Sequence, residues 1–431
     1  MPFPVSYHLR RLGSRLHRMR IALAVRGWKG LLRRTLPATT APASDAESPT
    51  APGFAPLPAS GIPATPLRWL LVDVSTPRPD RDSGSLRSCN LMRLLRADGH
   101  RVDFLPDDGV GGGTHAAALR DIGVTVHDGP RPGYPRWFAD KLDRYDVLVV
   151  SRYHLAEFLV PLARSIAPGI RVVLDTVDLH HVRERREAEL RADPRLRRLA
   201  HSTRRRELAA IAAADVTWVV SAAERGLVAD AVPGARIALL PNILEPVADP
   251  PGAQARAGLL FVGGARHPPN VDAVDWLVQE IFPRIRAAVP DCELHLVGDG
   301  LPQLPSLRDP VAGVIVHGHV PDLAPLLARC RVGLAPLRYG AGVKGKVNMY
   351  MAHGMAVVAT PSAAEGAFLE HGRDVLLADD AQGIADAVLR ACTDAALWRR
   401  LAEAGMENVR QHFSFAKARR GIADTLGMLE R

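Results

Sequence analysis

Short apolar runs alternate with helix-like segments along most of this chain, and the alternation starts twice. The first series comprises Trp69–Val74, Arg101–Leu105, Val124–His127, Asp146–Ser151, Arg171–Asp175, Val216–Val220 and Ile237–Leu240. The second comprises Leu259–Val262, Glu293–Val297, Val314–His317, Val332–Pro336, Ala356–Thr360 and Val375–Leu377. Such alternation is typical of a parallel sheet with helices on both faces. The sequence therefore predicts an α/β protein with two doubly wound, Rossmann-like domains.

The proline-rich segment Pro241–Pro251 interrupts the alternation and predicts an inter-domain linker. We expect an N-terminal domain over 67–243, a C-terminal domain over 252–413, and a terminal helix over 414–431 that packs near the domain junction. Two doubly wound domains in tandem would enclose a ligand cleft at the carboxyl ends of their strands. Residues 37–66 are rich in Pro, Ala, Ser and Thr, which predicts a disordered linker.

Residues 1–36 predict a basic amphipathic helix. Its apolar residues recur at spacings of three and four and form one stripe: Leu9, Leu12, Leu16, Met19 and Leu23. Most of its arginines fall on the other face, and Trp28 follows. This composition is typical of a helix that lies in the plane of a membrane surface. The alternative is a helix packed on the protein body or on a partner, with solvated arginines.

The charge balance narrows the class of partner. The net charge is +9, and residues 1–36 contain nine of the 55 basic residues and no acidic one, which leaves 46 basic and 46 acidic residues in the remainder. A neutral body argues against nucleic-acid binding. The four cysteines are scattered, and no apolar run approaches the ~20 residues that span a bilayer. We expect a cytoplasmic protein, peripheral on the cytoplasmic face of the inner membrane, without a metal site.

A glycine-lysine segment between two expected strands predicts a diphosphate site. Gly340, Gly342 and Gly345 allow the backbone to approach a ligand closely. Lys344 and Lys346 place two cations at the start of the helix expected over Val347–His353, where free N–H groups already favour an anion. The alternative is an ordinary strand–helix connection with solvated lysines.

Two further groups follow expected strands. Gly263 and Gly264 close the first strand of the second series, where they either admit a phosphate or sugar or simply form a tight turn. Asp178, His180 and His181 follow the strand that ends at Asp175, a preferred location for functional groups on parallel sheets. We favour hydrogen bonding to a ligand over metal binding, and the structural alternative is a helix-capping aspartate with satisfied histidines.

Several motifs together resemble glycosyltransferase family 4, the group 1 glycosyltransferases with the two-domain GT-B architecture. They are Phe261–Gly264, His267–Ala273, Leu296–Gly300, Gly318–Asp322, Gly340–Lys346 and Glu365–Gly366 in the second half, and Pro79–Ser85, Asp175–Glu184 and Pro241–Asn242 in the first. The resemblance covers about residues 68–431. It implies a retaining transferase that needs no metal or other cofactor and takes a nucleoside diphosphate-sugar as its donor.

The resemblance also implies roles for single residues. Lys344 and Lys346 would neutralise the donor diphosphate, and the backbone around His319 and Val320 would contact the base. Glu365 and Gly366, before a helix expected over Ala367–Glu370, would reach donor hydroxyls. The polar loop that contains Asp80, Asp82, Ser83 and Gly84 would lie on the acceptor side, although an ordinary turn is equally consistent with it. His180 or Asp178 would act at the donor sugar, and the run Arg183–Arg206 would be mostly a solvated helical surface.

One departure from the family pattern affects the donor site. The family's two glutamates, eight residues apart, align with Ala341 and Met349, so both carboxylates are absent. Another group must then hold the donor ribose, and Asn348 is a candidate. The expected activity is transfer of a sugar to a lipid-linked or polysaccharide acceptor in bacterial cell-surface polysaccharide synthesis. The alternatives are a catalytically impaired homologue that binds a nucleotide-sugar, or an epimerase or phosphorylase of the same architecture.

Overall fold

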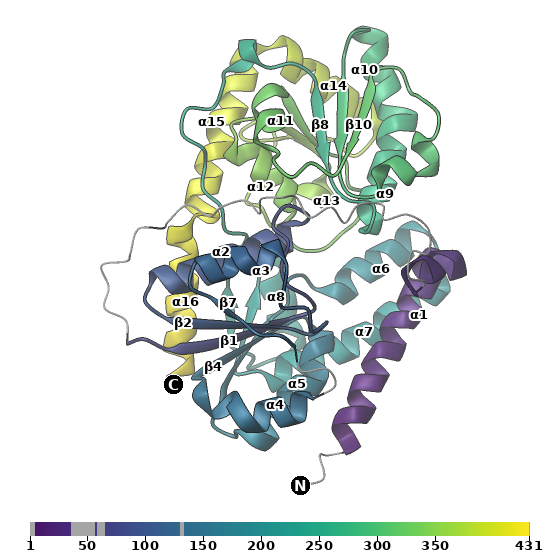
Figure 1. Cartoon of the computed structure of the whole chain (residues 1–431). Coiled ribbons are helices and arrows are strands. Elements are labelled where there is room, and N and C mark those ends of the chain that lie inside the picture. Colours follow the sequence, from purple (N-terminus) through teal and green to yellow (C-terminus); the bar gives the residue numbers. More distant parts are fainter. Residues whose placement is uncertain (1–4, 36–56, 58–64, 130–132, 431) are drawn as a thin grey trace. The chain divides into compact units, whose positions relative to one another are not determined.

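The computed structural model describes residues 5–35, 57, 65–129 and 133–430, and the side chains of residues 26–35 lie outside that description (Figure 1). Most of the predicted linker over 37–66 therefore lies outside the described residues, and so does the side chain of Trp28. The chain forms two compact units. Unit 1 contains residues 1–77, 91–240 and 421–431, and unit 2 contains residues 78–90 and 241–420.

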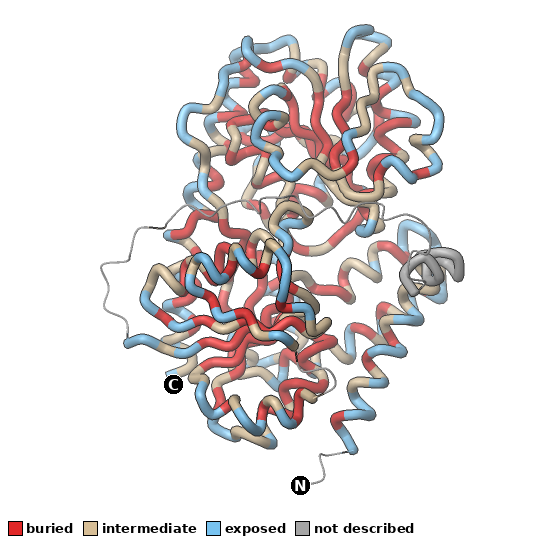
Figure 2. The backbone as a smooth tube through the Cα atoms, viewed as in Figure 1, coloured by how far each residue is buried: buried red, intermediate tan, exposed pale blue. Residues whose placement is uncertain are grey.

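Unit 1 is built on a seven-stranded sheet in the order β3-β2-β1-β4-β5-β6-β7, with every neighbouring pair parallel. The strands are β1 (Arg68–Asp73), β2 (Arg101–Pro106), β3 (Thr125–Val126), β4 (Val147–Ser151), β5 (Arg171–Asp175), β6 (Val216–Val219) and β7 (Ile237–Leu239). The helices between them are α3 (Thr114–Asp121), α4 (Tyr134–Lys141), α5 (Tyr153–Ile166), α6 (His180–Leu190), α7 (Pro194–Ala213) and α8 (Ala222–Ala231). The central strands are buried throughout, as Figure 2 shows.

Unit 2 has a six-stranded parallel sheet in the order β10-β9-β8-β11-β12-β13. Its strands are β8 (Leu259–Val262), β9 (Leu294–Val297), β10 (Val314–Gly318), β11 (Val332–Ala335), β12 (Ala356–Ala359) and β13 (Leu376–Leu377). Its helices are α9 (Pro268–Trp276), α10 (Phe282–Ala288), α11 (Ala324–Arg329), α12 (Gly345–Ala352), α13 (Pro361–Ala364), α14 (Ala381–Thr393) and α15 (Ala395–His412). The predicted fold class, two doubly wound α/β sheets, is confirmed.

One predicted helix of unit 2 differs from the structure. The helix predicted over Ala367–Glu370 is wrong, because these residues form a turn in which Phe368 has a φ of 59° and Gly366 a φ of 74°. The helix instead precedes Glu365, where the Thr360 side chain caps α13. A π-helical turn at Leu277–Ile281 separates α9 from α10, next to Pro283, which cannot donate a backbone hydrogen bond.

The N-terminal helix α1 (Val5–Thr35) packs against α5 and α7 (Figure 1). The side chains buried on this face are Tyr7, Ser14 and His17. The Ser14 hydroxyl donates to the His154 carbonyl over 2.9 Å, and His17 Nε2 lies 2.9 Å from the Thr203 hydroxyl. The apolar stripe points away from the body, since Leu12 is 54% and Met19 is 47% exposed. The helix thus packs on the protein body and still presents an apolar surface, and its attachment to a membrane stays a prediction.

The limits of the units depart from the predicted domains in two places. The segment 78–90, at the start of α2 (Ser83–Ala97), belongs to unit 2, where Arg87 Nε donates to the Pro241 carbonyl over 3.1 Å. The end of α16 (Phe415–Leu429) belongs to unit 1, where Trp218 Nε1 donates to the Thr425 hydroxyl over 2.7 Å. None of the described helices combines the length and apolar character that crossing a membrane requires.

Candidate functional site

The strand order of unit 2 reverses between β8 and β11, which are adjacent and parallel. Ligands of open α/β sheets bind beyond the carboxyl ends of the strands at such a reversal. The chain leaves β8 at Gly263 and leaves β11 toward the segment Gly340–Lys346. The two glycine-containing segments singled out in the sequence therefore leave neighbouring strands at the switch point of one sheet.

Gly263 is required by close packing at the end of β8. A Cβ atom on this residue would lie 2.6 Å from the side-chain carbon of Asn270, and the Asn270 amide nitrogen donates to the Gly264 carbonyl over 3.0 Å. On the other side, a Cβ on Gly298 would lie 2.3 Å from the Gly263 carbonyl oxygen. This turn is held from two directions, which fixes the backbone that a ligand would meet.

Lys344 directly precedes α12 (Gly345–Ala352), and Lys346 lies in its first turn. The Lys344 ammonium group is buried and donates to the Gly342 carbonyl over 2.7 Å. Lys346 Nζ donates to Asn270 Oδ1 over 2.7 Å and lies 4.1 Å from the centre of the Phe261 ring. Burial, together with the charge of Lys344, lowers the pKa of Lys346 to about 7.

No carboxylate pairs with Lys346 among the described residues. Both ammonium groups lie near the free N–H groups at the start of α12, and Lys346 has no counter-ion in the described chain. The electrostatic potential at this position is therefore strongly positive. An anion that enters this position would be bound by Coulomb attraction in surroundings of low dielectric constant. The arrangement suits a diphosphate.

The residues predicted on the acceptor side lie in unit 2 beside the lysine segment. Asp82 accepts from the Ser85 backbone N–H and from the Ser85 hydroxyl, both over 2.8 Å, and so caps the first turn of α2, which includes Gly84. Ser83 approaches α12 so closely that a Cβ on Gly345 would lie 2.2 Å from the Ser83 Cβ. The acceptor role of these residues stays a prediction.

Charged contacts that the sequence reasoning missed connect the same loop to the end of β9. Arg81 pairs with Asp299 over 3.0 Å, and His319 Nε2 lies 3.1 Å from the Asp80 carboxylate. Burial and the Arg81 charge lower the pKa of His319, whereas Asp80 opposes the change. Only a family motif around Asp299 signalled this position in the sequence, because an arginine and an aspartate so far apart in the chain carry no pairing signal.

Asn348 occupies the interior of unit 2. It is fully buried, and its Oδ1 accepts from the Asn242 amide over 2.9 Å, while its own amide nitrogen has no partner within the described part of the chain. Asn348 therefore fastens the linker segment to α12, and its role at the ribose stays a prediction. Val320 packs partly buried against the core of the unit, and Glu365 with Gly366 follows α13.

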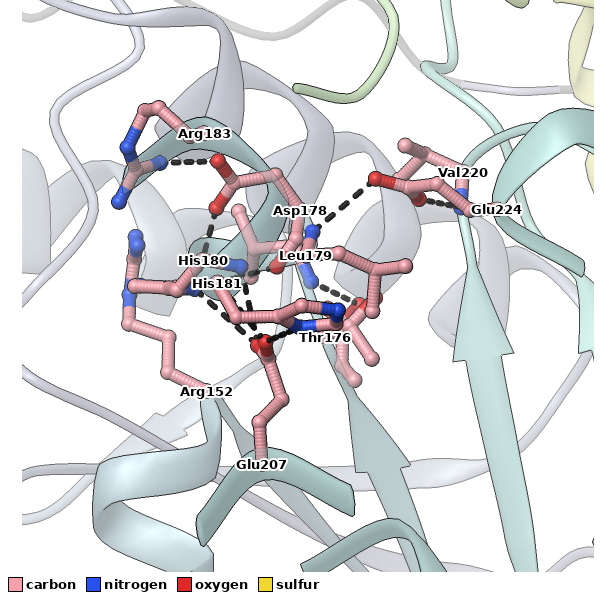
Figure 3. A network of polar contacts seen from close by, with 12 residues as sticks. Arg152, Thr176, Asp178, Leu179, His180, His181, Arg183, Glu207, Val220 and Glu224 are labelled. Atoms are coloured by element: carbon pink, nitrogen blue, oxygen red, sulfur yellow. Dashed lines mark hydrogen bonds and ion pairs between the residues drawn. The ribbon is translucent and has the colours of Figure 1, made fainter. Parts of the chain in front are cut away.

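Unit 1 carries a second polar cluster, at the carboxyl end of β5 (Figure 3). Asp178 forms an ion pair with Arg183, and its other oxygen lies 3.2 Å from His180 Nδ1. Val177, directly before Asp178, has a φ of 63°, which is unfavourable for a β-branched residue. Backbone strain of this kind concentrates at functional sites.

Glu207 of α7 holds both histidines of this cluster. Its carboxylate accepts from the backbone N–H groups of His180 and His181 over 3.0 and 3.1 Å, and it lies 2.6 Å from His181 Nδ1 (Figure 3). Although burial favours the neutral acid, the hydrogen bonds from both histidines lower the pKa of Glu207 to about 2. Glu207, absent from the candidates chosen from the sequence, caps α6 in place of Asp178.

These contacts favour the charged form of His180. Burial opposes protonation, but the Asp178 and Glu207 carboxylates raise the pKa of His180 above its usual value. A protonated imidazole can donate a hydrogen bond to a sugar hydroxyl or to a developing negative charge. Within the described residues no group of three or more His, Cys, Asp or Glu side chains has an arrangement suited to a metal ion.

Residues 256–394, about a third of the chain, match the model of the family described as "Glycosyl transferases group 1". Among curated proteins, no sequence gives a significant match.

Similar solved structures cover most of the chain. Sucrose-phosphate synthase from Thermosynechococcus elongatus superposes with a TM-score of 0.62 at 18% identity, over 84% of this chain and 99% of that one. Anabaena HepE in complex with UDP and glucose gives a TM-score of 0.59 at 17% identity, over 84% and 99%. A UDP-forming trehalose-phosphate synthase from Burkholderia xenovorans gives 0.56 at 13%, over 85% and 99%. The chain thus has the GT-B fold of glycosyltransferases, and the match to the group 1 family model lies within its second unit.

Proposed function

We propose that this protein transfers a sugar from a nucleoside diphosphate-sugar to a lipid-linked or polysaccharide acceptor. The observation that supports this most is the lysine pair at the switch point of unit 2, where Lys346 lacks a carboxylate partner within the described chain. The Anabaena structure with the same fold contains UDP and glucose. We place the activity in bacterial cell-surface polysaccharide synthesis, as the family resemblance implies.

In the proposed reaction, the bond between the anomeric carbon and the donor phosphate oxygen breaks, and the acceptor hydroxyl oxygen takes its place on the same face. Lys344 and Lys346 neutralise the diphosphate that leaves, because preorganised cations stabilise charge that develops in the transition state. The acceptor proton passes to the leaving phosphate, so the step needs no metal and no enzyme nucleophile. His180, oriented by Glu207 and Asp178, donates a hydrogen bond to the transferred sugar.

The experiment is a donor screen followed by product analysis on the full chain. A thermal-shift panel of UDP, GDP, dTDP and ADP identifies the base, because stabilisation grows with ligand concentration relative to the dissociation constant. Mass spectrometry then follows the matching sugar donors with a membrane lipid extract as acceptor. A glycosylated product from wild type, lost in K344A and K346A, supports the proposal. Turnover within about twofold of wild type in both variants would contradict it.

A second candidate rests on Ala341 and Met349, which replace the family's two glutamates. Without those carboxylates the protein would bind a nucleotide-sugar without transferring it. Nucleotide binding with no product and no donor hydrolysis supports this candidate. A changed free monosaccharide without transfer points instead to an epimerase.

We also propose that the exposed stripe of α1 docks on the inner membrane surface. The stripe is exposed at Leu9, Leu12, Leu16 and Met19 although the opposite face packs on the body. Substituting L12S, L16S and M19S together is expected to reduce co-sedimentation with anionic vesicles. The matched control is L190S with L227S, which removes two leucines that are similarly exposed elsewhere in unit 1. Equal vesicle binding by the two variants would contradict this attachment.

A further inference from the structure

Helices α6 and α7 of unit 1 form a hairpin, joined at residues 191–193, that contains a pocket of about 370 Å³. All but one of its lining side chains are basic, and they come from both helices: His181, Arg185, Arg197, Arg198, His201 and Arg204. The remaining lining residue is Ala200. A pocket lined by arginine and histidine, with no carboxylate among its lining residues, attracts an anion.

Most of this charge has no partner in the described chain. Arg197, Arg198, His201 and Arg204 are exposed and form no ion pair with another described residue. Arg185 lies 3.8 Å from Glu189 on the outer surface of α6, an exposed pair of little energetic weight. Like charges gathered along one helical hairpin repel one another, and this repulsion is relieved when a counter-ion binds.

The chemistry of the lining selects the anion. Arginine presents planar, fixed donors that match the oxygens of phosphate in a bidentate manner. Three of the pocket residues, Arg197, His201 and Arg204, follow one another at spacings of four and three and therefore share one face of α7. A stripe of donors along a helix suits a group with several phosphate oxygens, such as a diphosphate ester.

The position of the pocket connects it to two features already described. Among the lining residues, His181 lies 2.6 Å from Glu207, the carboxylate that also accepts from the backbone N–H of His180. Along α7, Thr203 contacts His17 of α1, and Arg206 donates to the Gly13 carbonyl over 3.4 Å. The pocket therefore lies on the helix pair to which both the histidine cluster and the apolar helix α1 are attached.

We propose that this pocket binds the phosphate or diphosphate ester of the acceptor, at the surface of the membrane on which α1 docks. The proposal rests on the proposed transferase function and names the acceptor group that unit 1 recognises. The same oxygens occur on a lipid headgroup and on a free phosphate, so the experiment must separate these two sources.

The test compares pyrophosphate binding by three full-chain proteins that all carry K344A/K346A, which removes the expected donor diphosphate site. The pocket variant is R197Q/H201Q/R204Q, and the matched control is R195Q/R205Q, which removes two exposed arginines of α7 outside the pocket. Calorimetry with inorganic pyrophosphate is expected to show affinity weakened roughly tenfold or more in the pocket variant and nearly unchanged in the control. Equal pyrophosphate affinity in all three proteins would overturn the proposal.

A second experiment with lipid vesicles shows whether the bound phosphate belongs to a lipid headgroup or to a free phosphate ester. Co-sedimentation uses phosphatidylcholine vesicles that contain either phosphatidic acid or the same charge as phosphatidylserine. A lipid source predicts that the pocket variant loses binding to phosphatidic acid selectively. Loss of pyrophosphate binding with unchanged vesicle binding also supports the pocket and assigns it to a free phosphate ester. Calorimetry and co-sedimentation both measure binding and do not depend on sugar transfer. A failed transfer assay would therefore contradict the proposed function without changing the result for the pocket.

Discussion

Lys346 donates a 2.7 Å hydrogen bond to the side-chain oxygen of Asn270, and Asn270 in turn donates to the Gly264 carbonyl. One amide thus joins the lysine segment after β11 to the glycine pair after β8. The neutral amide orients the ammonium group without cancelling its charge. This relationship leaves Lys346 able to attract an anion.

Replacing Asn270 by aspartate tests that role. In N270D the new carboxylate would pair with Lys346, so we expect nucleoside diphosphate affinity to fall by roughly tenfold or more, the scale of a charge-assisted pair. Calorimetry with the nucleotide selected by the thermal-shift panel measures the change. The matched control D272N alters a neighbouring carboxylate of α9 that pairs with Arg338 instead. Unchanged affinity in N270D would show that Lys346 does not contact the ligand.

The low pKa of Lys346, about 7, predicts a pH dependence of nucleotide binding. A bound diphosphate favours the charged amine and raises this pKa, so binding takes up a proton only above pH 7. Affinity is therefore expected to be insensitive to this lysine below pH 7 and to weaken progressively as the pH rises above it. Titrations from pH 6 to 9 check this, and the K346M variant should lose that slope. The same slope in wild type and K346M would assign the proton to another group.

The lowered pKa of Glu207 predicts a pH dependence of the stability of unit 1. Its pKa is about 2 in the folded protein, below the usual carboxylate value, so its contribution is present above the unfolded pKa and is lost as pH falls. E207Q is expected to destabilise unit 1 by on the order of 2–3 kcal/mol at neutral pH, and this deficit should shrink between about pH 4.5 and 2. Urea unfolding at several pH values measures it. A deficit that is constant with pH would contradict the assignment.

The hydroxyl of Tyr350 is expected to stabilise the attachment of α12 to the sheet. Its buried hydroxyl accepts from the Val262 backbone N–H over 2.8 Å and so connects α12 to the end of β8. Y350F leaves that N–H without its partner, and we expect a loss of about 1–3 kcal/mol in the free energy of unfolding. Nucleotide affinity should fall as well, because Lys346 begins the same helix. A variant as stable as wild type would show that water or another group replaces the hydroxyl.

The sequence predicted the sheet architecture well, because each strand is a short apolar run between polar turns. Leu259–Val262 and Arg171–Asp175 match β8 and β5 residue for residue. The short helix after β12 was misplaced, because the capping by Thr360 competes with an equally plausible start after Gly366. Local patterns could not decide between the two.

The contacts of the candidate site were harder to predict from the sequence than the strands. The lysine segment was selected from residue types alone, because glycines and lysines at a helix start suit a bound anion, and its role stays a prediction. Glu207 lies 27 residues from His180, directly after the run Arg183–Arg206 that predicts a solvated surface, and the packing of α7 on α6 buries it. The same packing gathers the arginines of the hairpin into a pocket. Partners brought together by tertiary packing leave no spacing signal.

The central claim is that Lys344 and Lys346 neutralise a diphosphate. Its most direct test is calorimetry of the best nucleoside diphosphate and of the corresponding nucleoside, each with wild type and with K344A/K346A. The account predicts that the double variant loses affinity for the diphosphate while its affinity for the nucleoside stays near the wild-type value. An equal loss for both ligands, or no loss for either, would contradict it.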